Sequence, residues 1–417
     1  MKHVLSTEQK NRHHLTRARL EIDLDALGYN AKQLKSWHGG AKMTAVVKAD
    51  AYGHGSVAIA RYLEDHKLTE RFAVATVDEA LRLREAGISL PIEILSLTAR
   101  GRLDDVVRLS CCQVLCSIEE AEALNEAAAL QGKKALCHVA TDVGMNRIGI
   151  PIYETNPEGS TEVLKLALHI EQLEHLELEA LMTHFPQADD ASQDEKTLEL
   201  YQRFCALTER VQESLGRPIL SHCSNSAFFI RHPELTLDFY RPGIALYGLL
   251  PDDCDNEALT LKPVAALKAE VSYVKEVPKD SSVSYGQRYT FDQKASVATL
   301  ACGYADGYAR ALGDRARVCF ENQATGYVRG VVCMDAMMVE VKGDLIPEVG
   351  SSVLLFGDEG PSLTELAEQL ETIHYELLCR ISSRVPRVYI ADQKLIALQN
   401  AQQGYFEIPA EPIETRR

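Results

Sequence analysis

The chain has 417 residues and a formal net charge of −16 at pH 7, with 46% hydrophobic and 25% charged residues. This length favours two domains over a single core. The composition is typical of a globular protein, and an acidic balance with no basic stripe argues against a nucleic-acid partner. The chain has eleven cysteines but no CxxC pair, and this spacing argues against a zinc site or a disulfide framework. These cysteines favour reduced thiols in a cytoplasm.

The N-terminal residues 1–17 are polar and are expected to form an extension. They lack the apolar core of a secretion signal, and no later run is long enough to span a membrane. We therefore expect a cytoplasmic protein with no membrane partner. The segment 18–26, ARLEIDLDA, is strand-like. It can pair with a later domain and so tie the two ends of the chain together.

The segment 43–55, MTAVVKADAYGHG, places Lys48 at the end of an apolar, β-branched run. A lysine at the end of a buried strand is costly unless it is solvated or bonded. Burial lowers the pKa of an amine, and a lysine of this kind can form an imine with a carbonyl, including that of pyridoxal 5'-phosphate (PLP). From the spacing alone, a lysine that merely leaves the sheet and reaches water is the more common case.

Short apolar runs alternate with amphipathic stretches as far as Pro251. This alternation predicts a parallel sheet covered by helices, and a count of eight runs favours a closed (β/α)8 TIM-type barrel over residues 18–255. The eight expected strands are Met43–Lys48, Arg71–Thr76, Ile92–Leu97, Gln113–Ser117, Ala135–Asp142, Leu178–Phe185, Ile219–Asn225 and Tyr240–Tyr247.

Polar residues fall where these strands end, which is where such barrels carry their chemistry. They are Lys48, Asp142, Arg147, His184, Asn225, Ser226 and Arg241. The turn after the last strand, at Gly243 and Ile244, is a frequent phosphate site in barrels. Each of these residues, taken alone, is also compatible with a structural role.

Residues 256–417 read as a mostly β domain, because their apolar runs are short, alternating and separated by glycine and proline. The expected strands include Ser282–Tyr289, Gly326–Cys333 and Ser352–Phe356, and only Leu363–Gln369 looks helical.

Several of these segments together resemble the alanine racemases, PLP-dependent (fold-type III) enzymes that interconvert L- and D-alanine. The matching segments are AVVKADAYGHG, GMNRIG, THF, SNSA, FYRPGIALYG, VSYG, GYADG, CMD and HYE, and the resemblance extends from about Leu20 to Ile390. It implies that Lys48 carries PLP and moves a proton, and that Tyr285 is the second acid/base. It further implies a homodimer in which Tyr285 comes from the partner subunit.

The resemblance also assigns the binding residues. Arg241 would contact the pyridine nitrogen, and His184 would stack on the ring or bond to Arg241. Arg147, Met334 and Asp335 would hold the substrate carboxylate, and Tyr304 would line the entrance. The phosphate side would be formed by Tyr52, Asn225, Ser226, Gly243, Ile244 and Tyr375. No metal is implied.

An arginine opposite the pyridine nitrogen has a chemical consequence. Because a guanidinium does not give up its proton under ordinary conditions, the pyridine nitrogen stays an unprotonated acceptor. The cofactor is then a weaker electron sink, which should limit side reactions such as transamination.

The chain departs from the family at two positions. Several members carry a carbamylated lysine seven residues before the GMxR arginine, where this chain has Ala140, and an arginine two residues before CMD, where it has Val331. Asp142, an anion such as chloride, or water can replace the carbamate beside Arg147. We expect activity that does not depend on bicarbonate, and serine or other small amino acids remain open as substrates.

Three other functions compete with racemisation of alanine. A PLP-dependent decarboxylase of this shape usually places an acidic residue, not an arginine, near the pyridine nitrogen. A PLP-homeostasis protein is a single barrel without VSYG. A degenerate racemase that only binds is separated from an enzyme by assay. Biosynthetic and catabolic roles for D-alanine, the former including the supply of a peptidoglycan precursor, are not distinguished.

Overall fold

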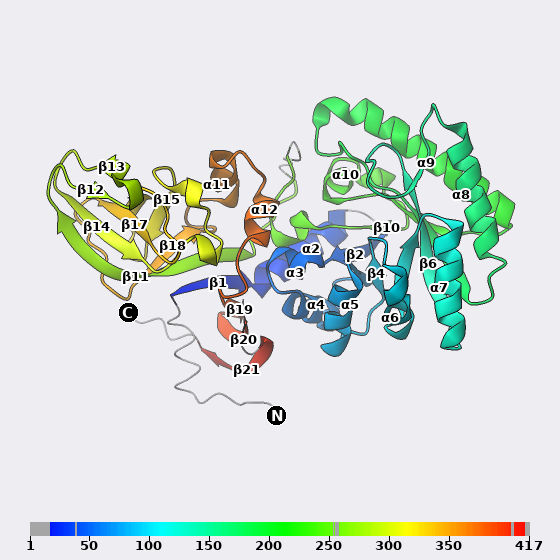
Figure 1. Ribbon diagram of the computed structural model, residues 1–417, viewed down its shortest axis with the longest axis horizontal. Coiled ribbons are helices and arrows are strands. Elements are labelled where there is room, and N and C mark those ends of the chain that lie inside the picture. Colours follow the sequence, from blue (N-terminus) through cyan, green and yellow to red (C-terminus); the bar gives the residue numbers. More distant parts are fainter. Residues whose placement is uncertain (1–16, 38–39, 253, 255–257, 402–403, 413–417) are drawn as a thin grey trace. The chain divides into compact units, whose positions relative to one another are not determined.

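The computed structural model describes residues 17–37, 40–252, 254, 258–401 and 404–412. The chain divides into two compact units (Figure 1). The first, called the barrel unit, comprises Ala26–Ala51 and Ile59–Lys262. The second, called the β unit, comprises residues 17–25, Tyr52–Ala58 and the described residues between 263 and 412.

The barrel unit is built on eight parallel strands in the order β10-β2-β3-β4-β5-β6-β8-β9. An isolated parallel bridge between Ser224 and Tyr240 links the last strand to the first. The sheet therefore closes on itself, and the expected (β/α)8 barrel is confirmed. The strands are β2 (Lys42–Val46), β3 (Arg71–Val74), β4 (Ile92–Ile94), β5 (Cys111–Leu115), β6 (Ala135–Asp142), β8 (Leu176–Met182), β9 (Leu220–His222) and β10 (Phe239–Tyr240).

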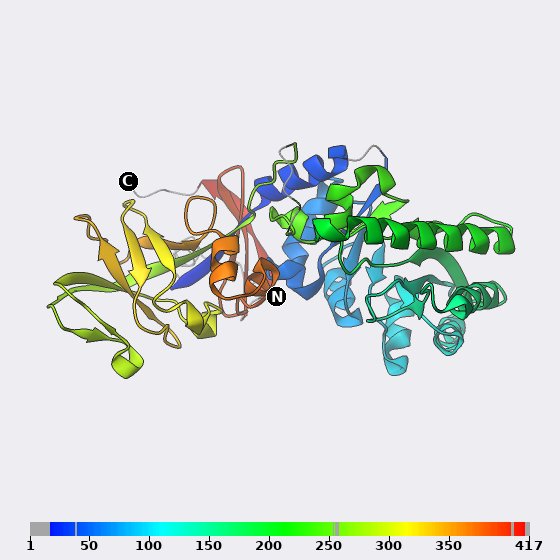
Figure 2. The same ribbon diagram turned by 90° about the horizontal axis from the view of Figure 1, so that it is seen from above.

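Helices α5 to α9 lie outside these strands (Figure 1), and α9 is seen along its length in Figure 2. Local signals set their ends. Thr76 and Glu79 form a capping box at the start of α5, Ser117 caps α7, and Gly216 ends α9 in the left-handed conformation. The helices are α2 (Leu24–Trp37), α4 (Ser56–Asp65), α5 (Val77–Glu85), α6 (Leu103–Arg108), α7 (Ile118–Leu130), α8 (Pro157–Ile170), α9 (Asp194–Leu215) and α10 (Ser226–Arg231).

The β unit holds a ten-stranded, mostly antiparallel sheet in the order β14-β17-β16-β15-β18-β11-β1-β19-β20-β21. The N-terminal strand β1 (Ala18–Asp23) lies between β11, to which it is antiparallel, and β19, to which it is parallel. The remaining strands are β11 (Ala265–Val277), β14 (Ala295–Leu300), β15 (Arg317–Phe320), β16 (Thr325–Val328), β17 (Met337–Lys342), β18 (Ser352–Phe356), β19 (Arg387–Ala391), β20 (Lys394–Asn400) and β21 (Gly404–Pro412).

Two of the expected strands contain a 3-10 turn. Of Tyr240–Tyr247 only Tyr240 belongs to a strand, and the 3-10 helix η4 (Ile244–Tyr247) follows. Pro242 has no N–H with which to continue a ladder. The run Ser282–Tyr289 is a hairpin, β12 (Ser282–Val283) and β13 (Tyr289–Thr290), around the 3-10 turn η5 (Tyr285–Gln287). Ser284 enters this turn with φ 67°.

The β unit also carries two short helices, α11 (Leu363–Gln369) and α12 (His374–Cys379). In the described part of the chain, no helix combines the length and the apolar character needed to cross a membrane.

Candidate active site

Lys48 lies directly after β2, at the start of an unusual turn. Ala49, Asp50, Ala51 and Tyr52 all have φ between 52° and 56°, so the backbone makes a left-handed helical turn. This conformation costs roughly 1–2 kcal/mol for each residue with a Cβ. Strain of this kind persists only where the surroundings enforce it, and it is concentrated at functional sites.

The carboxylate of Glu79 holds this turn against helix α5. One oxygen accepts a hydrogen bond from Ala49 N at 2.7 Å, and the other accepts from Ala75 N at 2.7 Å. Asp50 is also paired with Arg82 at 3.2 Å. These contacts fix the backbone beside Lys48 and so define where its side chain begins.

Arg241 is buried after β10, with 4% of its surface exposed. Its Nη2 donates to the carbonyl oxygens of Thr183 at 2.8 Å and Cys223 at 3.3 Å, and its Nη1 donates to Nδ1 of His222. Three acceptors therefore fix the guanidinium. Sequence reasoning did not single out His222, which stands four residues before Ser226 in the SHCSNS segment.

His184 is partly buried at the end of β8. Burial, together with the positive charges of Arg241, Arg147 and Lys48, lowers the pKa of His184 to about 3. The ring is therefore neutral at physiological pH. The structure thus brings four of the expected site residues into one electrostatic neighbourhood. Among the described residues, the histidine that is bonded to Arg241 is His222.

Ser226 and Gly243 form a small cradle beside Arg241. The backbone N–H of Gly243 donates to Ser226 Oγ at 2.9 Å, and both Ser226 and Ile244 are buried. Asn225 caps α10 by accepting from Phe228 N at 2.9 Å. A hydroxyl and backbone N–H groups at a helix start are suited to bind a phosphate.

Arg147 lies in the loop after β6, and the buried carboxylate of Asp142 organises this loop. It accepts from Gly144 N at 2.7 Å and from Arg147 N at 3.2 Å. Asp142 therefore bonds to the backbone, and no bond to the Arg147 guanidinium is present among the described residues. Ala140 packs in an apolar cluster with Val114 and Met182, and its methyl side chain offers no amine to carbamylate.

In the β unit, the segments VSYG, GYADG and CMD lie together. Ser284 Oγ donates to Val331 O at 2.7 Å, and Tyr304 N donates to Cys333 O at 3.0 Å. Tyr285 is 71% exposed at the tip of the β12–β13 hairpin, and Met334 is 53% exposed.

Two further contacts order this unit. The carboxylates of Asp335 and buried Asp306 both accept from the Arg384 guanidinium, at 2.8 and 2.7 Å. The rings of Tyr52 and Tyr375 lie 6.2 Å apart between centroids, and burial raises the pKa of the Tyr52 phenol well above its usual value. Tyr52 therefore remains a neutral hydrogen-bond donor.

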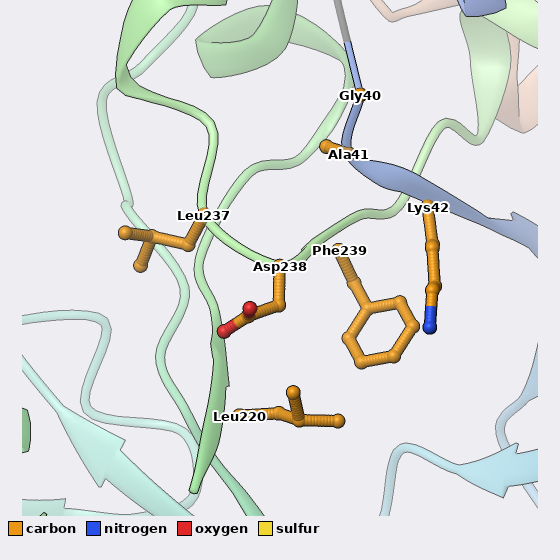
Figure 3. A pocket seen from close by; sticks show the side chains of 7 residues that line it. All are labelled: Gly40, Ala41, Lys42, Leu220, Leu237, Asp238 and Phe239. Carbon is orange, nitrogen blue, oxygen red and sulfur yellow. The ribbon is translucent and has the colours of Figure 1, made fainter. Parts of the chain in front are cut away.

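A separate pocket lies at the opposite end of the barrel strands. Lys42, Leu220 and Phe239, each near the start of its strand, line it together with Asp238 (Figure 3). The carboxylate of Asp238 is already bonded to Ser221 N and Oγ. Barrel chemistry belongs at the carboxyl ends of the strands, and we assign this pocket no part in it.

The donor set of the barrel unit fits PLP. It offers an amine at Lys48, a guanidinium held in place at Arg241, and a hydroxyl at Ser226 that is oriented by the backbone N–H of Gly243. These are the groups needed for the aldehyde, the ring nitrogen and the phosphate of that cofactor. A closed parallel barrel with this donor set, followed by an antiparallel β unit, defines a PLP-type barrel enzyme.

Comparisons with known proteins narrow this class. Residues 22–251 match the family model of the alanine racemase N-terminal domain, and residues 264–389 match that of the C-terminal domain. An alanine racemase of Clostridium perfringens is 39% identical over 387 residues, which is 91% of this chain and 97% of the relative. The chain belongs to the alanine racemase family, a family of isomerases.

Solved structures agree with this assignment. The alanine racemase of Clostridium difficile 630 superimposes with a TM-score of 0.86 at 36% identity, over 92% of this chain and 98% of that one. The alanine racemase of Bacillus anthracis with bound L-Ala-P gives a TM-score of 0.82 at 31% identity, over 92% of this chain and 97% of that one.

Proposed function

We propose that this member of the alanine racemase family interconverts L- and D-alanine by a two-base reaction with PLP as cofactor. When bound, PLP supplies the electron sink that makes the Cα proton of the amino acid acidic. Lys48 and Tyr285 are the two groups that move protons. Inversion then needs one group on each face of Cα, with no rotation of the substrate.

Lys48 is the amine that would hold the cofactor and move a proton on one face of Cα. The left-handed turn behind it is held by Glu79 and fixes its backbone. The single observation that carries the proposal is that Lys48 and Arg241 follow the neighbouring strands β2 and β10, where Glu79 holds the turn of Lys48 and His222 and Thr183 hold the guanidinium of Arg241.

Tyr285 is the acid/base from the other face, and it reaches the site from a partner subunit. Its exposure of 71% on a strained hairpin tip supports this role, because a phenol presented in this way is available to a second chain. A two-fold homodimer with two shared sites is the simplest arrangement. Arg147, Met334 and Asp335 hold the substrate carboxylate in this proposal, and Tyr304 lines the entrance.

The chain's eleven cysteines are all free thiols, which supports the cytoplasm as its compartment. Neither the serine-directed nor the decarboxylase alternative is favoured by the comparisons, since the relatives above are named alanine racemases.

The test removes each base in a separate variant and measures cofactor absorbance, racemisation and deuterium exchange in D2O. The Lys48→Ala variant should lose the visible absorbance of lysine-bound cofactor together with its activity. Tyr285→Phe should keep that absorbance but racemise about 10²–10⁴-fold more slowly. It should still exchange the Cα proton of one alanine enantiomer for deuterium without inversion. Racemisation by Tyr285→Phe at the wild-type rate would refute the two-base assignment.

A further inference from the structure

The interior of the barrel holds an unusual group of charged and titratable side chains. Arg71 from β3 meets Glu179 from β8, and Glu93 from β4 meets His222 from β9. These pairs of strands are not neighbours in the sheet, so the side chains must point inward. Barrels of this kind usually fill their interior with aliphatic residues.

The group forms a continuous series of contacts that ends at Arg241. Arg71 is bidentate to Glu179 at 2.8 and 2.9 Å, and Glu179 Oε2 lies 2.7 Å from His138 Nε2. His138 Nδ1 lies 3.2 Å from Glu93 Oε1 and 3.0 Å from His222 Nε2. The Nδ1 of His222 accepts from Arg241. We call Arg71, Glu179, His138, Glu93 and His222 the core network.

Hydrogen-bond chemistry assigns the protons of this network. Arg241 can only donate, so Nδ1 of His222 must be unprotonated. A neutral His222 then carries its proton on Nε2, on the side of the ring that faces Glu93. Burial and the Arg241 charge keep the pKa of His222 well below its ordinary value, against the pull of Glu93.

His138 is the cation of the network. Burial disfavours its charged form, but Cys112, Glu93 and Glu179 around it outweigh burial and raise its pKa well above the ordinary value. Both ring nitrogens then donate to carboxylates. His222 Nε2 lies 3.6 Å from Glu93 Oε1, which is beyond hydrogen-bond distance but close enough for the carboxylate to attract the proton on Nε2.

The same residue types can bind a metal, since ligand atoms of Glu93, His138 and His222 lie within 4.8 Å of one another. The flanking charges argue against it. Arg71 and Arg241 stand at the two ends of the network, and a divalent cation between two guanidinium groups would be strongly repelled in a buried site. The hydrogen-bond network is the better account.

We propose that Glu93, held in place by His138, is a positioning residue for the guanidinium of Arg241. Its carboxylate attracts the His222 proton to Nε2, which leaves Nδ1 of His222 free to accept from Arg241 and so holds the guanidinium in the orientation needed to face the pyridine nitrogen. This inference rests on the proposed binding of PLP against Arg241. Buried charges are costly compared with aliphatic side chains, and a role in fixing Arg241 explains why they stand in the barrel core.

The first test replaces the carboxylate of Glu93 by an amide of the same shape. The holoenzyme of Glu93→Gln should release more pyruvate per D-alanine formed, because a less firmly held guanidinium permits more transamination. We expect an increase of about tenfold, equivalent to one pKa unit at the ring nitrogen. Glu64→Gln is the matched control, since Glu64 is a carboxylate of the same unit that bonds to Ser89 and Leu90, away from the network.

A double variant separates positioning from a general structural effect. If Glu93 acts through Arg241, then Glu93→Gln should add little to the product ratio in an Arg241→Lys background. An unchanged product ratio in Glu93→Gln, or full additivity in the double variant, would overturn the proposal.

The second test needs no variant of the network and no activity. Nitrogen NMR of the histidine rings in the wild-type protein, with and without PLP, should show one imidazolium and one neutral Nε2–H ring in mutual contact. These are His138 and His222, whose centroids lie 4.9 Å apart. A neutral His138 or an Nδ1–H His222 would contradict the inference. Failure of the wild type to bind PLP would instead count against the proposed function.

Discussion

The guanidinium of Arg241 donates from a buried position to His222, Thr183 and Cys223. A charge held in this way is poorly screened by water, so its effect on a neighbouring ring nitrogen is large. Selectivity between racemisation and transamination is therefore expected to depend on this residue.

Arg241→Glu places an acceptor where a permanent donor stood. The ring nitrogen of a bound cofactor should then become protonated and the cofactor a stronger electron sink. We expect the ratio of pyruvate to D-alanine formed to rise by at least about tenfold. Chromatography of both products from one reaction measures this ratio, and an unchanged value would be contrary to the account.

His138 makes stability depend on pH in a defined direction. Because its folded-state pKa is raised, the stabilisation it provides is fully present below its unfolded pKa of about 6.5 and is lost as the pH rises above that value. The groups facing its ring are Glu93, Glu179, Cys112 and His222.

The free energies of unfolding of wild type and His138→Gln should therefore differ most near pH 6 and converge toward pH 9, by at most about 1.4 kcal/mol per pH unit. Urea denaturation at several pH values measures this. A difference that stays constant or widens would show that His138 is not charged in the folded protein.

For single residues, the sequence predicted site candidates where a charged residue stands at a position that is usually apolar or structural. A lysine ending an apolar run and an arginine before Pro-Gly could both be singled out. His222, His138 and Glu93 could not, because their meaning comes from contacts between strands that are far apart in the chain and meet only inside the closed barrel.

Among the structural elements, the turn after β2 shows how strain is maintained near the site. Four residues in the left-handed region are followed by Gly53, whose φ is +83°. A Cβ on Gly53 would come within 2.3 Å of the carbonyl oxygen of Leu378. The backbone here requires glycine both for its conformation and for space.

Gly53→Ala should lower the free energy of unfolding by about 2–4 kcal/mol, from the left-handed conformation plus the collision. Gly87→Ala is the control, because Gly87 has φ +87° and nothing within 4 Å of an added Cβ. Its cost should be only about 1 kcal/mol. Equal losses in the two variants, measured by urea denaturation, would show that the Leu378 carbonyl moves aside.

The pattern of apolar residues predicted β6, β18 and α11 at the observed bounds. It failed where the backbone conformation of a single residue determines where a strand ends. Pro242 ends β10 after two residues, and the positive φ of Ser284 turns an expected strand into a hairpin. Neither feature appears in a pattern of hydrophobicity. The second failure matters for function, because it places Tyr285 at an exposed tip.

For the whole molecule, two features of the sequence were enough to predict a barrel followed by a β domain. Apolar runs alternate with amphipathic stretches before Pro251, and short alternating runs separated by glycine and proline follow it. The family assignment agrees with both parts. The assembly of the active site is a different matter, because in the proposed reaction it depends on a second chain. Our central claim is that Lys48 of one subunit and Tyr285 of the other act on the same alanine.

Mixing two inactive variants tests this claim most directly. Lys48→Ala and Tyr285→Phe homodimers each have two defective sites, but a mixed dimer with shared sites has one intact site and one doubly defective site. After subunits are exchanged at equal amounts, about a quarter of all sites should be intact. Racemase activity should then reappear at about a quarter of the wild-type value. Continued inactivity, with mixed dimers shown to be present by native mass spectrometry, would contradict the account.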